Sequence, residues 1–362
     1  MKVRLTYTAV GVSIPASGRP STSIRYAPHQ EIRHVSHAFR RPALVSIALV
    51  AALGLAGCAS SASPDAEPGG DATSAATVTV TDNHGEIEVP VAPERVVALD
   101  NTTFQTLSDW DIELVAAPKP LMYDLWPNLS GGDDVLDVGL HREPDLEAII
   151  SAQPDLIVGG YRFRDIYDDL TAIQPATIET SAREGEEQVA ELKRQVEILG
   201  QVFDREDDAK KLADDLDSAV ADAKAAYNGT DTVVGLLTSG GKISFAAPGE
   251  GRGVGAVFPT LGLVPGIDRG AENASHGDDI SVEAIAAANP EWLIVLDRDA
   301  MFGEDGYVSA KELIEGSEAL QNVPAVQKGQ IVYLAPSFYL DEGIQAYTTL
   351  YADIATAFAA AA

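Results

Sequence analysis

The chain has 362 residues, and cysteine and histidine, which often act in catalysis or bind metals, are scarce in it. This scarcity argues against an enzyme. Cys58 is the only cysteine, so neither an internal disulfide nor a multi-cysteine metal site can form. Only three histidines follow it, His84, His141 and His276, and histidines so scattered make a poor divalent-metal site. The chain also lacks the Gly-x-Ser-x-Gly motif of a hydrolase nucleophile. We therefore expect no enzyme activity and no permanently bound cofactor.

The chain is strongly acidic, so the positions of its few arginines can indicate where an anionic ligand would bind. The formal net charge is −30. Residues 1–57 hold seven Lys/Arg and one Asp/Glu, so the remainder carries 18 basic and 54 acidic residues, a net −36. Such an acidic surface argues against nucleic acid as a partner and repels anions at long range. Any site for an anionic ligand must therefore be built from local arginines.

The surroundings of Cys58 predict export. Arg40 and Arg41 precede an apolar and small-residue run at 43–57, which ends in Leu-Ala-Gly directly before the cysteine. This order is similar to a bacterial lipoprotein signal, whose cleavage site needs small residues. The alternative is a membrane anchor, but the run has 15 residues where a bilayer needs about 20. We expect a lipid on Cys58 to hold the exported protein at the outer face of the cytoplasmic membrane.

Strand-like and helix-like segments alternate in the rest of the chain, which indicates a parallel α/β sheet. A hairpin is expected first, at 77–80 and 86–90. Further strands are expected at 95–99, 155–159, 231–237, 292–296 and 331–334, and helices at 145–152 and 282–288. Between the halves lie two segments of helical period, 186–199 and 204–227. The second is long, charged and free of glycine, as a rigid connection would be, although a surface helix of one domain is the alternative.

The two halves share an internal sequence similarity. Leu146–Pro154 parallels Val282–Pro290, with a glutamate seven residues before the proline in both and an apolar strand directly afterwards. Helix-proline-strand units of this kind are common in α/β proteins. This internal similarity is modest evidence for two similar lobes.

Several motifs carry a more specific resemblance. In the first half they are Pro93–Asp100, Val138-Gly139 ahead of Glu143–Glu147, and Pro154–Val158; in the second half they are Leu237–Ser244, Ser275–Gly277 and Leu296–Ala300. On these residues the chain resembles the class III, helix-spine solute-binding proteins of iron-siderophore ABC importers, and most of all their ferric catecholate branch. The resemblance implies two Rossmann-like α/β lobes joined by a long rigid α-helix, with a ligand cleft between the lobes.

The resemblance further implies a ligand site with three arginines, Arg162, Arg252 and Arg298. A ferric tris-catecholate carries about three negative charges on a propeller of aromatic rings, which guanidinium groups can both hydrogen-bond and stack on. The three arginines follow predicted strands or lie in glycine-rich loops, where open α/β sheets place ligands. Relatives commonly have the arginine directly after glycine, but here Tyr161 intervenes, so Arg164 is the fallback for Arg162. Ion pairing on the surface is the alternative, most of all for Arg298, which two aspartates flank.

Other roles also come from the resemblance. His276 and Tyr339 are similar to the pair that completes iron coordination in some relatives when the siderophore supplies only four donors. Glu147 and Glu283 resemble the acidic pair that docks onto the two permease subunits, and Glu143 competes for the first of these roles. The alternative for each docking glutamate is stabilisation of a helix N-terminus, worth about 0.3–1 kcal/mol.

The sequence thus predicts an ordered set of segments. They are a signal peptide with an over-long start at 1–57, a lipidated cysteine and flexible tether at 58–76, an N-terminal α/β lobe at 77–185, a helical spine at 186–228 and a C-terminal α/β lobe at 229–362. We expect a monomer that captures a ferric siderophore and delivers it to an ABC importer. The alternatives are another iron chelate (a hydroxamate siderophore, haem or cobalamin) and a structural surface lipoprotein without a transport ligand.

Overall fold

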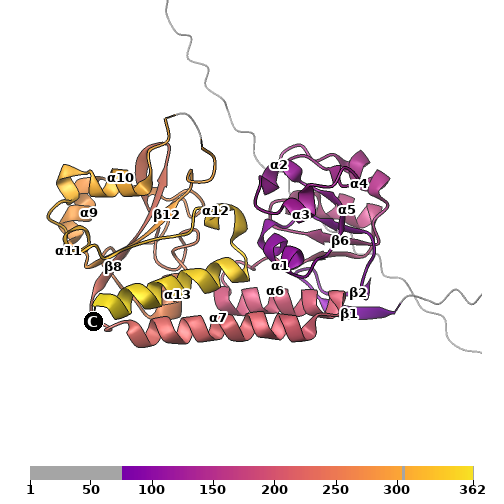
Figure 1. Ribbon diagram of the computed structural model, residues 1–362, viewed down its shortest axis with the longest axis horizontal. Helices are drawn as coiled ribbons and strands as arrows, with labels where there is room; N and C mark the ends of the chain where they lie inside the picture. The colour runs from indigo at the N-terminus through magenta and orange to yellow at the C-terminus, as the bar shows by residue number, and fades with distance from the viewer. Residues whose placement is uncertain (1–75, 304–305, 362) are drawn as a thin grey trace, which may run out of the picture. The chain divides into compact units, whose positions relative to one another are not determined.

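The computed structural model describes residues 76–303 and 306–361 (Figure 1). The predicted signal segment and Cys58 lie outside the described residues, as does nearly all of the predicted tether. Within the described part of the chain, no helix is both long enough and apolar enough to cross a membrane.

The first lobe is built on a parallel sheet of five strands in the order β5-β4-β3-β6-β7. The strands are β3 (Val96–Ala98), β4 (Leu114–Ala117), β5 (Leu136–Asp137), β6 (Leu156–Gly159) and β7 (Thr177–Glu179). Every residue of β3, β6 and β7 is buried, as expected for parallel strands covered on both faces. The helices are α1 (Phe104–Asp109), α2 (Lys119–Met122), α3 (Pro127–Ser130), α4 (Leu146–Ala152) and α5 (Tyr167–Ile173). The predicted hairpin, β1 (Thr77–Thr81) with β2 (Glu86–Pro90), precedes this sheet.

The second lobe is built on a mixed sheet with the order β11-β9-β8-β12-β13, and β10 (Val264–Pro265) also pairs with β8. Its parallel part is β8 (Thr232–Ser239), β12 (Trp292–Asp297) and β13 (Ile331–Tyr333), with the short β10 also parallel to β8. β9 (Lys242–Phe245) and β11 (Asp278–Asp279) are antiparallel additions. The helices of this lobe are α8 (Val257–Leu261), α9 (Val282–Ala288), α10 (Ala310–Glu315), α11 (Pro324–Lys328) and α12 (Phe338–Asp341).

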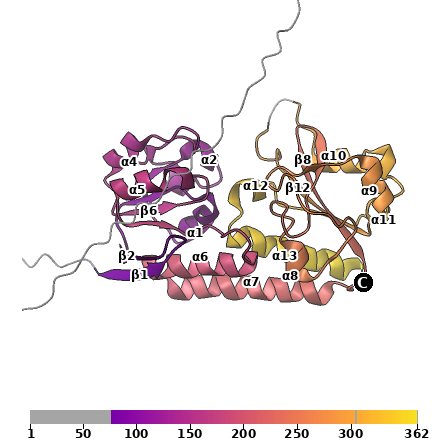
Figure 2. The same cartoon turned by 180° about the vertical axis from the view of Figure 1, so that it is seen from behind.

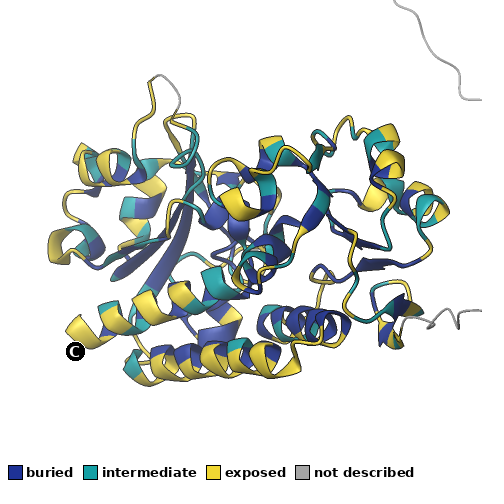
Figure 3. Cartoon of the chain, turned by 45° about the vertical axis from the view of Figure 1, so that its right-hand side comes forward, coloured by how far each residue is buried: buried dark blue, intermediate teal, exposed yellow. Residues whose placement is uncertain are grey.

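Long helices connect the two lobes (Figure 2). α6 (Gln188–Phe203) and α7 (Glu206–Ala226) pack on each other, and the C-terminal helix α13 (Ile344–Ala361) packs on α7. α6 contacts β1 of the hairpin, whereas α7 contacts α8 of the second lobe. The outward faces of these helices are exposed and their inward faces buried (Figure 3). The two amphipathic segments predicted between the halves are therefore confirmed as helices that reach both lobes.

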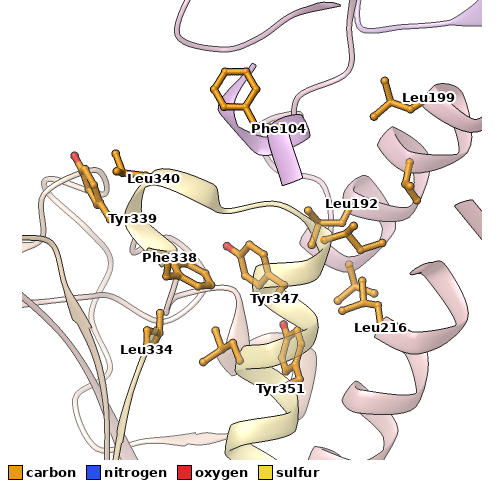
Figure 4. Packing of buried hydrophobic residues seen from close by; sticks show 14 of the residues in the cluster. Phe104, Leu192, Leu199, Leu216, Leu334, Phe338, Tyr339, Leu340, Tyr347 and Tyr351 are labelled. Carbon is orange, nitrogen blue, oxygen red and sulfur yellow. The ribbon is translucent and has the colours of Figure 1, made fainter. Parts of the chain in front are cut away.

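One hydrophobic cluster joins both lobes to these helices. It contains residues of each sheet, residues of α6, α7 and α13, and the α12 segment (Figure 4). The internal similarity between the halves is also visible in the structure. Helices α4 and α9 have seven residues each, and each ends at a residue in the left-handed conformation, Gln153 (φ 48°) or Asn289 (φ 49°). Each helix then leads through a proline into an inner parallel strand, β6 or β12. The predicted fold class of two α/β lobes joined by helices is confirmed.

Candidate functional site

The site begins where two neighbouring strands of the first lobe end. Asp100 follows β3, and its carboxylate accepts hydrogen bonds from the Thr102 amide (3.1 Å) and hydroxyl (2.9 Å). A Cβ on Gly160, which follows β6, would lie 2.5 Å from the Asp100 side chain, so only glycine lets the two strand ends come this close. Burial raises the pKa of Asp100 to about 6, although the Thr102 hydrogen bonds oppose the shift. This packing places the segment that carries Arg162 beside the end of β3.

Arg162 lies against a neutral partner. Its Nε donates to Oδ1 of Asn101 at 2.8 Å, and its guanidinium lies 5.1 Å from the centre of the Tyr161 ring. Its Nη2 is buried and has no hydrogen-bond partner among the described residues. Arg164, the fallback, is exposed at the start of a 3₁₀ turn. Of the two arginines, Arg162 is therefore the one whose side chain enters the protein with unused hydrogen-bonding capacity.

Arg252 is held much more firmly, by groups from both lobes. Its Nε donates to Oε1 of Glu342 at 2.7 Å, and its Nη2 donates to the other oxygen of the same carboxylate. The same Nη2 also contacts the hydroxyl of Tyr161 (3.1 Å) and the backbone carbonyl of Tyr339 (3.2 Å). Burial acts to lower the pKa of Arg252, but the Glu342 carboxylate more than offsets it and raises that pKa above its usual value.

Tyr339 joins Arg252 to Arg298. The Arg252 guanidinium carbon lies 4.0 Å from the centre of the Tyr339 ring, and that of Arg298 lies 5.2 Å from it. Tyr339 is only 7% exposed, and its hydroxyl is directed away from Phe338 (Figure 4). Arg298 directly follows β12 and donates from Nη1 to Ser239 Oγ at 2.8 Å. Its Nε is buried without a partner in the described chain.

A cavity of about 310 Å³ opens beside Arg252. Both lobes and the connecting helices line it, with Thr102 and Tyr161 from the first lobe, Gln188 from α6, and Gly249–Gly253, Ser275 and Glu342 from the second lobe. Of the five predicted ligand residues, only Arg252 lines this cavity directly. Arg298 and Tyr339 are connected to it through the stack on Arg252, and Arg162 through the Tyr161 ring.

The remaining predicted residues lie on the surface. His276 is exposed, next to the cavity residue Ser275, and its backbone amide donates to Asn273 Oδ1 at 3.2 Å. No group of three or more histidine, cysteine or acidic side chains suited to a metal occurs among the described residues. Glu147 and Glu283 are exposed in the first turns of α4 and α9, and Glu143 is exposed as well.

Two residues of this arrangement were not found from the sequence. Asn101 follows β3 at the same sheet edge as Arg162, so the rule that ligands bind at the carboxyl ends of strands could have identified it. Its Nδ2 donates to the Leu340 carbonyl at 2.8 Å and so ties the first lobe to α12. Glu342 gave no signal, because its partner Arg252 is 90 residues away in a chain with 55 acidic residues.

As a chemical environment, the site offers guanidinium groups and aromatic faces for an anionic ligand with flat rings. Arg252, Arg298 and Tyr339 form a cation-π stack in the second lobe, and Arg162 with Tyr161 repeats the combination in the first lobe. Tyr161 stays protonated at neutral pH, since burial and then the Glu342 charge raise its pKa to about 12. It can therefore donate a hydrogen bond as well as accept one.

Comparison with known proteins places the chain among solute-binding proteins. The profile of the Peripla_BP_2 family, described as "Periplasmic binding protein", matches residues 96–337. The petrobactin-binding protein YclQ of Bacillus subtilis is 29% identical over 311 residues, which cover 83% of this chain and 93% of YclQ. The ferric-anguibactin-binding protein FatB of Vibrio anguillarum is 25% identical over 269 residues, which cover 73% of this chain and 81% of FatB.

The solved structures agree with this placement. The periplasmic catecholate-siderophore binding protein VctP of Vibrio cholerae superposes with a TM-score of 0.68 at 25% identity, covering 77% of this chain and 99% of VctP. Proteins of this family bind solutes and are not enzymes, as the residue content of the sequence indicated. The chain is therefore a member of the periplasmic binding protein family, with the two-lobed, helix-connected fold of its class III members.

Proposed function

We propose that this protein captures a ferric siderophore, most suitably a catecholate, outside the cytoplasm and delivers it to an ABC importer for iron uptake. The observation that carries the proposal is the cation-π arrangement of Arg252 and Arg298 on Tyr339, with Arg162 and Tyr161 facing it from the other lobe. Guanidinium groups on aromatic rings match a ligand that is both anionic and built of flat rings. The names of the relatives YclQ, FatB and VctP support the same ligand class.

In this proposal each predicted residue has a role. Arg162, Arg252 and Arg298 hydrogen-bond the catecholate oxygens, and Tyr161 and Tyr339 contact the rings. When a siderophore supplies only four donors, His276 and Tyr339 complete the coordination of iron. Phenolate oxygen and imidazole nitrogen are both suitable ferric ligands. The exposed position of His276 supports this role, because an exposed loop residue can turn toward a ligand at little cost.

Delivery requires that the protein stay near its importer. We infer that residues 1–57 are removed, that Cys58 carries the lipid anchor, and that 58–76 forms a tether to the lobes at 77–185 and 229–362, with the spine at 186–228 between them. Glu147 and Glu283 then dock onto the permease, with Glu143 as the competitor for the first role. Their exposure in matching first turns of α4 and α9 supports this assignment. The protein acts as a monomer with one ligand.

The test is an intrinsic-fluorescence titration of the chain from Ala59 with three ferric complexes: a tris-catecholate, a tetradentate catecholate and a hydroxamate. The proposal predicts submicromolar quenching by the catecholates and weaker quenching by the hydroxamate. A preference for the hydroxamate would reassign the ligand within the same fold. Absence of binding to all three complexes would contradict siderophore capture and favour a structural surface lipoprotein.

A further inference from the structure

The most unexpected group in the candidate site is an acid. Glu342 lines the cavity next to Arg252, and its side chain is only 11% exposed, compared with 13% for the arginine. The two side chains form a two-pronged ion pair through Nε and Nη2 of the guanidinium. A carboxylate in this position repels the anionic ligand that the arginines attract.

The backbone fixes Glu342 in place. It ends α12 in the left-handed conformation (φ 52°), and its amide donates to the Phe338 carbonyl at 3.1 Å. From the other lobe, Asn101 holds α12 through the Leu340 carbonyl. The backbone thus sets the place of Glu342 in the cavity wall, and the two hydrogen bonds from Arg252 hold its carboxylate there.

The three arginines differ in what neutralises them. Arg252 is paired with Glu342, and Arg298 contacts the Asp299 carboxylate at 3.5 Å. Arg162 has the neutral Asn101 as its partner. The charge of Arg252 is thus balanced by a buried carboxylate before any ligand arrives, and that of Arg298 is partly offset. An anion placed against Arg252 also lies close to Glu342, and their repulsion grows with the charge of the anion and is poorly screened in a half-buried site.

We propose that Glu342 is a specificity-determining residue, which makes the site discriminate against ferric complexes with three negative charges in favour of complexes with fewer. This inference rests on the proposed function and refines its ligand class. A ferric ion bound by four catecholate oxygens carries a single negative charge, whereas one bound by six carries three. The preferred ligand is then a ferric catecholate of low charge, which leaves iron sites for donors such as His276 and Tyr339.

The experiment compares two ferric complexes of one shape and different charge. A hexadentate tris-catecholate carries three negative charges, and a hexadentate tris-hydroxypyridinonate has the same propeller of flat rings with no net charge. Both saturate iron, so protein ligands to the metal do not contribute. The dissociation constants are measured on the full chain in detergent, for the wild type and for Glu342→Gln, which keeps an oxygen for Arg252 Nε and removes the charge.

The proposal predicts that Glu342→Gln lowers the Kd of the tris-catecholate about tenfold and changes that of the neutral complex less than about twofold. The matched control is Glu184→Gln. Glu184 lies two residues from the cavity residue Ala182, but it is exposed and does not line the cavity. For this control both constants should change less than about threefold, because water screens an exposed charge.

Other outcomes overturn the proposal. Equal weakening of the binding of both complexes by Glu342→Gln would mean that the acid only supports Arg252.

If the Glu342→Gln protein does not fold, a double variant, Arg252→Gln with Glu342→Gln, removes both charges together. That double variant must keep the tris-catecholate affinity within about tenfold of the wild type, whereas Arg252→Gln alone must lose about 30-fold. If the wild type binds neither complex, the proposed function fails too; if it binds them and no variant shifts the preference, only the role of Glu342 fails.

Discussion

The two lobes share a scaffold but treat positive charge differently. In both, a seven-residue helix with an exposed glutamate in its first turn leads into an inner parallel strand, whose end carries an arginine of the site. In the second lobe, Arg252 and Arg298 are each in contact with a carboxylate and stacked on Tyr339. In the first lobe, Arg162 has only the amide of Asn101 and a buried nitrogen without a described partner.

This difference indicates that the two lobes contribute to ligand binding in different ways. In the second lobe, carboxylates and Tyr339 orient the guanidinium groups, and the same carboxylates offset part of their positive charge. Both Arg162 and Arg298 have a buried guanidinium nitrogen without a described partner, so the difference lies in charge: no described carboxylate contacts Arg162, whereas Asp299 contacts Arg298. We therefore expect Arg162 of the first lobe to supply the largest single share of ligand affinity.

The largest effect is expected for Arg162. Arg162→Ala should weaken binding of a ferric tris-catecholate about 100-fold, because it removes a guanidinium that no described carboxylate contacts, together with its hydrogen bonds to the ligand. Arg164→Ala is the matched control two residues away, and its exposed side chain predicts a change of less than about threefold. Fluorescence titration measures both. A larger loss for Arg164→Ala than for Arg162→Ala would show that the assignment of the arginine is wrong.

A smaller effect is expected for Arg298. Arg298→Ala should weaken binding of the same complex about tenfold, since Asp299 already offsets part of the arginine charge. Asp299→Asn, titrated in parallel, should strengthen binding of the tris-catecholate by a few-fold. A larger loss of affinity for Arg298→Ala than for Arg162→Ala would contradict the expected difference between the lobes.

The shared part of the scaffold can be tested through the docking glutamates. Glu147→Ala and Glu283→Ala should each reduce importer-dependent iron uptake about fivefold, because each removes one interfacial charge. Ligand affinity should be unchanged, since neither residue lines the cavity. Glu143→Ala serves as the comparison for the first lobe. Uptake that falls for Glu143→Ala and not for Glu147→Ala would transfer the docking role.

The connection between the lobes predicts a pH-dependent stability. Burial raises the pKa of Asp341 to about 7, although the hydrogen bond from the Gly343 amide opposes the shift. The folded state thus holds this proton more tightly than the unfolded state does. The associated stability is complete below about pH 4 and is lost as the pH rises through about 7. Asp341→Asn should raise the melting temperature by about 2–6 °C at pH 8 and leave it unchanged at pH 4.

The smallest expected change is in the arrangement of the lobes on ligand binding. Helices that pack into one hydrophobic cluster with both lobes should permit limited closure. Small-angle scattering should therefore give nearly equal radii of gyration for the free and the ligand-bound protein. A pronounced contraction would show that the helical connection bends.

The fold was predictable because its signals are local. Apolar runs identified β6, β8 and β12, and the helical period of α6 and α7 was correct to within a few residues. The short strands β5, β10 and β11 have only two residues each, too few for any period to be seen. Their pairing depends on tertiary contacts rather than on their own sequence.

The site was predictable only in part. Arg162 and Arg298 were named because the family pattern places arginines after these strands, although Tyr161 interrupts that pattern before Arg162, and their role in ligand binding stays a prediction. Their actual partners, Asn101 and Tyr339, depend on which loops meet between the lobes, and no local pattern encodes that meeting. The pairing of Arg252 with Glu342 joins residues 90 positions apart across two loops, so it became visible only in the structure.

The central claim is that one ferric complex lies between the two lobes, in contact with arginines from both. Anomalous diffraction at the iron edge, from crystals of the chain grown with a ferric tris-catecholate, tests this most directly. The account predicts a single iron peak bordered by Arg162, Arg252 and Arg298. A peak elsewhere on the molecule, or no peak in crystals that bind the complex in solution, would contradict it.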